Sequence, residues 1–122
     1  MAKWSHTDVI DGALNIIKNN ANLMVLCSAQ PTNRTEAVST YALADVAMAS
    51  GDFTISTGDA SGRKCTVAAK NNVTVDTTGT GTHIALVDDT RLLFVSTTSS
   101  QGVTQGNSVN LPTWDIEIAD PV

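Results

Sequence analysis

The stretch Trp114-Asp115-Ile116-Glu117-Ile118 has the clearest alternation of apolar and polar residues in the chain. A strand places successive side chains on opposite faces, so the two isoleucines and Trp114 lie on one side and the two acidic residues on the other. This segment therefore predicts a β-strand with one face in a core and one face in solvent. The register also favours core packing of Trp114 over stacking on a ligand.

The same period of two recurs upstream, between turn signals. It is clear in residues 53–56 and 64–70, and residues 83–87 and 91–95 flank Asp88-Asp89-Thr90 as a hairpin. Short strands spaced by about ten residues predict an antiparallel β-sandwich or a barrel-like fold. The fold class expected is mainly β, with seven to nine short strands.

Polar segments separate these strands and are expected to be turns and loops. Asn71-Asn72 is a tight-turn pair, and residues 77–81 form a Gly/Thr loop. Residues 96–106 lack large hydrophobic side chains except Val103, so we expect a long exposed loop there. Pro112 cannot donate a backbone hydrogen bond and places the preceding strand at a sheet edge.

The N-terminal part has helical rather than strand periodicity, with Ser5 as a candidate cap and Asn19-Asn20 as a left-handed stop signal. Residues 23–28 then read as a short buried strand, and residues 36–48 as a loop or turn followed by a strand over 42–48. The apolar stripe of the helix consists of Val9, Ile10, Ala13, Leu14, Ile16 and Ile17.

Length and charge set the domain count and exclude several partners. The 122 residues suit a single β-sandwich domain over 1–122, with the helix at about 6–20 and the β-rich core at about 22–119. A net charge of -5 argues against nucleic acid and against an anionic membrane surface. The longest apolar run, residues 23–27, is too short for a bilayer span, and no signal peptide is evident. We therefore expect synthesis in a reducing cytoplasm.

No arrangement of residues indicates catalysis, so we expect no enzyme, no cofactor and no catalytic or metal-binding residues. His6 and His83 lack metal-ligand spacing, and His83 reads as an exposed edge residue. The Asp88-Asp89 pair and the Asp59-Ala60-Ser61-Gly62 turn could each bind calcium, but turn aspartates commonly bond their own backbone. Cys27 and Cys65 have no CxxC spacing, which favours buried free thiols over a disulfide or metal pair.

Seven segments spread over almost the whole chain carry a resemblance to known proteins: Trp4-Ser5, 13–21, 25–32, 41–46, 61–64, 83–88 and 114–121. These segments resemble a family of small virion structural proteins of tailed bacteriophages and prophages. The resemblance implies a virion component and carries no catalytic residues.

The resemblance does not place the protein on the particle. Our first hypothesis is a capsid decoration (cement) protein on the capsid exterior, made in the host cytoplasm, because a compact acidic β-domain with few charges suits passive binding. Its partners would be the major capsid protein and copies of itself, as a homotrimer. The alternative is a collar, tail or fibre component that binds a receptor or glycan. We expect contacts through residues 1–6, 30–40 and 96–106, and Trp4 either staples the helix start or inserts into a neighbouring molecule.

Overall fold

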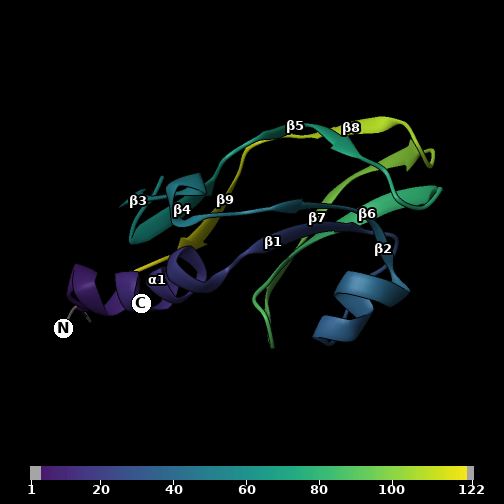
Figure 1. Ribbon diagram of the computed structural model, residues 1–122. Helices are drawn as coiled ribbons and strands as arrows, with labels where there is room; N and C mark the ends of the chain where they lie inside the picture. The colour runs from purple at the N-terminus through teal and green to yellow at the C-terminus, as the bar shows by residue number, and fades with distance from the viewer. Residues whose placement is uncertain (1–3, 121–122) are drawn as a thin grey trace.

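The computed structural model describes residues 4–120, and strands dominate this part of the chain (Figure 1). It contains one α-helix and nine strands, and every strand pair is antiparallel. The predicted mainly β fold with an N-terminal helix is therefore confirmed. In chain order the elements are α1 (Thr7–Asn20), β1 (Leu23–Cys27), the π-helical turn η1 (Glu36–Thr40), β2 (Ala42–Ala47), the 3-10 turn η2 (Ser50–Asp52), β3 (Phe53–Thr57), β4 (Arg63–Val67), β5 (Lys70–Thr74), β6 (Gly79–Val87), β7 (Leu92–Val103), β8 (Ser108–Leu111) and β9 (Trp114–Ile118).

The strands form three sheets in a sandwich-like arrangement. Their orders are β2-β1-β6-β7, β3-β4-β9 and β5-β8. In Figure 1 the β5–β8 pair lies across from the four-stranded sheet, and α1 lies beside β3, β4 and β9. One core cluster takes buried side chains from α1 and from all three sheets, so these elements enclose a shared interior.

Strand β1 and the second half of the inner strand β6, residues 84–87, are buried on both faces, which explains their continuous apolar sequences. Met24 and Leu26 point into the main core. Val25 and Cys27 point the other way, into a second cluster that includes Ala37 of η1. Residues 23–28 were predicted to contain a short buried strand, and β1 confirms this. The prediction of a turn followed by a strand over 42–48 is confirmed by η1 and β2.

The register of β9 matches the alternation in its sequence. Ile116 lies opposite Cys65 of β4 and is only 4% exposed, whereas Glu117 lies opposite Lys64 and is exposed. Trp114 is partly buried and packs against the main core, as its place in the pattern predicted. Both cysteines are buried free thiols, also as predicted, and burial raises the pKa of Cys27 to about 11.

Helix α1 has the predicted extent but different ends. The side chain of His6, not Ser5, caps it, since His6 Nδ1 accepts a hydrogen bond from the Asp8 backbone N–H at 3.0 Å. At the other end Asn20 donates its side-chain amide to the Ile16 carbonyl, and Ala21 follows with φ -63°. The helix therefore stops without the left-handed residue that Asn19-Asn20 predicted.

Two of the expected loops are strands instead. Residues 96–106 continue β7 as far as Val103, and the 77–81 segment already belongs to β6 from Gly79 onward. The reason is pairing along one long hairpin: Gly79 lies opposite Val103 and Gly81 opposite Gln101, so the backbone ladder continues although few apolar side chains mark it. His83 consequently lies on an inner strand, between β1 and β7, rather than at a sheet edge.

The Asn71-Asn72 pair lies inside β5 rather than in a turn. The register of β5 against β8 shifts between Lys70 and Val73, and Asn72 has φ 57° at this irregularity. Asn tolerates this left-handed conformation, so the same property that suggests a turn also suits a bulge. No turn separates β4 from β5 either: Val67 lies opposite Trp114 and Lys70 opposite Leu111, so the chain continues in one direction from its pairing with β9 to its pairing with β8.

Candidate interaction surface

Helix α1 carries more apolar surface than its own packing covers. Ile10, Leu14 and Ile17 form its buried stripe. Val9 and Ile16 lie beside this stripe and are 70% and 48% exposed. Exposed apolar residues are unremarkable singly, but neighbouring ones indicate a contact surface. The outer side of α1 is therefore the first part of a candidate interaction surface.

An apolar groove extends this surface onto two strands. The groove has a volume of about 310 Å³, and its walls come from α1, the start of β7 and β9. Ile16, Phe94 and Ile118 contribute one side chain from each element, and the sole polar side chain in the lining is that of Glu117. We name this surface, made by Val9, Ile16 and the groove, the α1 apolar surface.

An aromatic pair lies beside the groove. The rings of Phe94 and Trp114 have centroids 5.9 Å apart and planes inclined by 31°. The indole N–H of Trp114 is buried and has no hydrogen-bond partner within residues 4–120. An unpaired buried donor is unfavourable, so the position of Trp114 is determined by packing of its ring rather than by its polar atom.

Trp4 projects from the molecule at the start of α1. It is 79% exposed, and its ring meets the edge of His6 at 5.9 Å between centroids. Residues Ser61, Arg63 and Asp120 line a shallow hollow of about 300 Å³ together with Trp4. Such exposure does not fit a staple that packs on the first turn of α1. The alternative, insertion into a neighbouring molecule, stays a prediction.

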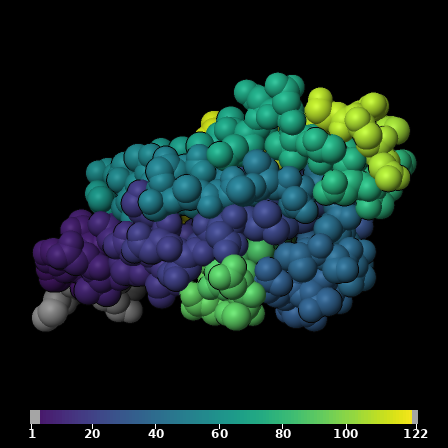
Figure 2. Space-filling view, in the orientation of Figure 1, coloured from purple at the N-terminus to yellow at the C-terminus, as the bar shows by residue number. Residues whose placement is uncertain are grey.

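The predicted contact segment 30–40 is held firmly by its own polar residues. Glu36 Oε1 accepts from both the backbone N–H and the hydroxyl of Thr32, at 2.8 and 2.6 Å, and these bonds lower the pKa of Glu36. Arg34 Nε donates to the carbonyl oxygen of Asp88 at 2.6 Å. This bond joins the segment to the tip of the β6–β7 hairpin, and the two lie side by side in Figure 2.

Of the other two predicted contact segments, only 1–6 lies partly outside the described residues. Its residues 1–3 are not described, and Trp4 is its exposed apolar side chain. Segment 96–106 is mostly the polar half of β7, with a turn at Gly106, where φ is 89°. The described parts of the three segments do not converge on one site, because the start of α1 lies at the opposite end of the molecule from η1 (Figure 1).

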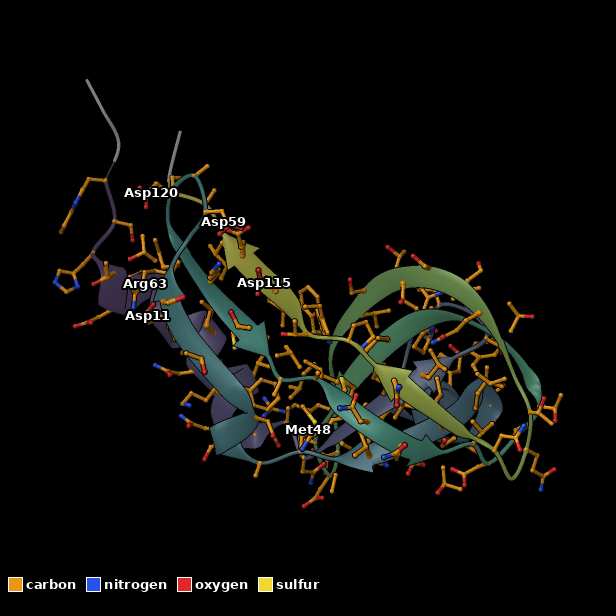
Figure 3. All side chains as sticks on the ribbon, turned by 90° about the horizontal axis from the view of Figure 1, so that it is seen from above. Asp11, Met48, Asp59, Arg63, Asp115 and Asp120 are labelled. Carbon is orange, nitrogen blue, oxygen red and sulfur yellow. The ribbon has the colours of Figure 1, made fainter. Side chains whose placement is uncertain are left out.

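The charged side chains are mainly paired with one another. Asp11 and Arg63 face each other at 2.8 Å, which ties α1 to β4, and Asp59, Asp115 and Asp120 lie at the same end of the molecule (Figure 3). Lys64 Nζ bridges Asp59 at 2.7 Å and Asp115 at 3.7 Å. The pKa of Asp59 is lowered by its bond to Lys64.

The remaining cations of the described chain are also engaged. Lys18 donates to the carbonyls of Ser50 and Phe53, Lys70 pairs with Asp52 at 2.9 Å, and Arg91 pairs with Asp88 at 2.7 Å. The uncompensated charge is therefore acidic. An example is Asp45, whose pKa is raised by burial and by nearby Asp76.

The geometry does not gather groups suited to catalysis. Asp88, one of the calcium alternatives, already accepts hydrogen bonds from the backbone of Thr90 and Arg91. Within residues 4–120, no cluster of three or more His, Cys, Asp or Glu side chains is placed to hold a metal ion. Among the described residues, no helix is both long and apolar enough to cross a bilayer.

Comparisons with known proteins do not assign a family: no protein-family model, no curated protein and no solved structure matches this chain. The α1 apolar surface was not anticipated as a site. The sequence did mark Val9 and Ile16 as part of the apolar stripe of α1. The apolar stripe is wider than one buried helix face requires. This extra width was the feature of the sequence that could have indicated an exposed apolar surface on α1.

Proposed function

We propose that this chain is a virion structural protein of a tailed bacteriophage, a capsid decoration (cement) protein that binds the shell of the major capsid protein. The resemblance described above suggests the virion. The α1 apolar surface is the observation that carries the binding role, because it offers a contact surface on a small domain held together by its own core and ion pairs.

The expected mode of binding is passive and multivalent. A groove of about 310 Å³ accepts one or two apolar side chains, so each contact with a shell is weak. Many equivalent contacts, joined by self-association, would give a large total affinity. As a decoration protein the chain would form a homotrimer on the capsid exterior, assembled from chains made in the host cytoplasm.

Co-sedimentation with purified empty capsids tests this proposal. We expect the chain to pellet with the capsids, and we expect Ile16→Lys to reduce the bound fraction at least fivefold because it places a charge in the groove. Asn19→Lys is the matched control, since Asn19 is exposed on the same helix outside the apolar stripe. Absence of co-sedimentation at every salt concentration would contradict the proposal.

The hollow beside Trp4 favours a second candidate, a collar, tail or fibre component that binds a glycan. An exposed aromatic ring next to the polar side chains of Arg63 and Asp120 combines a stacking face with hydrogen-bonding groups. The number of copies per virion separates the two candidates: hundreds indicate decoration, and a few to a few dozen indicate the collar or tail. Quenching of Trp4 fluorescence by a panel of sugars tests glycan binding directly.

A further inference from the structure

Strand β7 is an open edge of the four-stranded sheet. It spans 12 residues and bonds to β6 on one side, and within residues 4–120 no strand lies on its other side. A strand at a sheet edge presents a row of unpaired backbone N–H and C=O groups, which is a template for another strand. This edge belongs to the longest strand among the described residues.

The other edges carry features that discourage pairing. The outer side of β2 is occupied in part, because Asp76 and Thr77 donate to the Leu43 carbonyl. Strand β9 contains two acidic residues, and the short β3 lies against α1, with its first carbonyl bonded to Lys18. Strand β8 has only four residues. Charges, covering groups and shortness are the usual protections of edge strands.

Strand β7 has none of these protections. The sequence contains no charged residue between Arg91 and Asp115, and no proline occurs within β7. In Figure 3 the labelled charges Asp11, Asp59 and Asp115 gather at the end made by α1, β4 and β9, away from the arch of β6 and β7. With a net charge of -5 on each copy, two copies repel elsewhere, and β7 is the neutral strip along which they can meet.

Pairing of the whole β7 edge places neutral side chains opposite one another. In an antiparallel pair about a two-fold axis near the centre of β7, the same strand meets itself, so residues 92–95 of one copy lie opposite residues 100–103 of the other. No residue of β7 carries a charge, so like charges do not oppose each other at any position of the pair. Thr97 and Ser99 lie near the middle of this contact.

We propose that two copies of this chain associate by antiparallel pairing of their β7 edges, which joins their four-stranded sheets into one continuous sheet. The partner is a second copy of the chain, and the contact requires no capsid protein. It is a two-fold contact and predicts a dimer in solution, whereas the decoration hypothesis expects a homotrimer. The mass of the assembly decides between them.

The dimer should be weak, and its stability should increase slightly with salt. One pair of edges buries less than the roughly 800 Å² per partner that is usual for stable complexes. We therefore expect a monomer–dimer equilibrium that depends on protein concentration. Added salt should strengthen it slightly, because salt screens the repulsion between two acidic copies without weakening backbone hydrogen bonds.

Sedimentation velocity over a wide concentration range measures this equilibrium. The double variant Thr97→Lys/Ser99→Lys places two charges on exposed positions of β7 and should raise the dimer dissociation constant at least tenfold. The double variant Thr54→Lys/Thr57→Lys adds the same charge at exposed positions of β3 and should leave it within about twofold. Circular dichroism establishes that each variant is folded.

Amide hydrogen exchange on the unmodified chain gives a second readout that needs no variant. At high concentration the alternate β7 amides that point away from β6 should exchange at least tenfold more slowly than at low concentration. A chain that stays monomeric up to millimolar concentration, a trimer, or a dimer with unprotected β7 amides would each overturn this proposal. Capsid binding is measured in a separate assay, so a failure here is distinguishable from a failure of the proposed function.

Discussion

At the scale of single residues, Asp88 organises the tip of the long hairpin. Its Oδ1 accepts from the backbone N–H groups of Thr90 and Arg91 at 2.9 and 2.6 Å, and its Oδ2 accepts from Arg91 Nε. These bonds, the one from Thr90 foremost, lower the pKa of Asp88 to about 2 from an ordinary 3.8. The backbone carbonyl oxygen of Asp88 also accepts a hydrogen bond from Arg34 Nε. The carboxylate of Asp88 therefore stabilises the turn, and the residue's backbone carbonyl holds the segment 30–40 against the hairpin.

This depressed pKa predicts a pH-dependent contribution to stability. The carboxylate bonds are fully present above the unfolded pKa of 3.8 and are lost as pH falls through about 2. Asp88→Asn should therefore be less stable than the parent chain at pH 6, and the difference should shrink between about pH 4 and pH 2. Urea unfolding at several pH values measures it, with Asp89→Asn as the control. A difference that does not vary with pH would contradict the assignment.

Substitution of two glycines by alanine should change the stability of the fold in opposite directions. Gly62 has φ 69°, and an added Cβ would collide with the carbonyl oxygen of Ile118, so Gly62→Ala should destabilise the fold by at least about 2 kcal/mol. Gly12 lies in α1 with open space around it, and Gly12→Ala should stabilise the fold by about 0.5–1 kcal/mol. Thermal unfolding of both variants is the measurement, and equal effects would contradict this reading.

At the scale of elements, amphipathic segments could be predicted and polar strands could not. Strand β9 and helix α1 each have one buried face, so their periodicity was visible in the sequence. Apart from Val103, the far half of β7 consists of Ser, Thr, Gln and Gly, and it is a strand because it pairs with the start of β6. That pairing joins Gly79 to Val103 across the whole hairpin, a relation that no local pattern encodes. The caps of α1 were missed for a related reason, since His6 bonds through a specific side-chain geometry.

The register of β9 can be tested with two neighbouring substitutions. Ile116→Asp places an unpaired charge in the core and should prevent soluble folding, because its effect exceeds the stability of a typical small domain. Glu117→Lys lies on the exposed face and should leave the chain folded, with a loss of about 1 kcal/mol from its bond to the Asp59 N–H. Soluble yield and circular dichroism distinguish them, and unfolding of both would show that the register is wrong.

At the scale of the whole molecule, the candidate surface arises from packing between distant parts of the chain. Ile16, Phe94 and Ile118 come from three elements, and their groove exists only when α1 rests beside β7 and β9. The sequence shows that each of these three residues is apolar. Its periodicity could not show which of the three side chains the fold would leave exposed. The burial of both cysteines was easier to predict, because isolated cysteines without metal spacing are usually buried.

Those two thiols report on opening of the whole fold. With the pKa of Cys27 near 11, only ~0.1% of it is thiolate at pH 8, against ~25% for an ordinary cysteine, and burial raises the pKa of Cys65 as well. Alkylation by iodoacetamide should therefore be at least 100-fold slower in buffer than in 8 M urea. Mass spectrometry after timed quenching measures it. Rapid modification in buffer would mean that the interior opens far more readily than this packing implies.

Trp4 and Asp120, the first and last described residues, line the same hollow, at the end of the molecule where α1 begins (Figure 1). A short linker could therefore close the backbone into a ring, and new ends could be opened in the turn at Gly106. Such a circular permutant would present its ends at the far side of the domain. A fused peptide or dye could then be displayed from either side of the same scaffold.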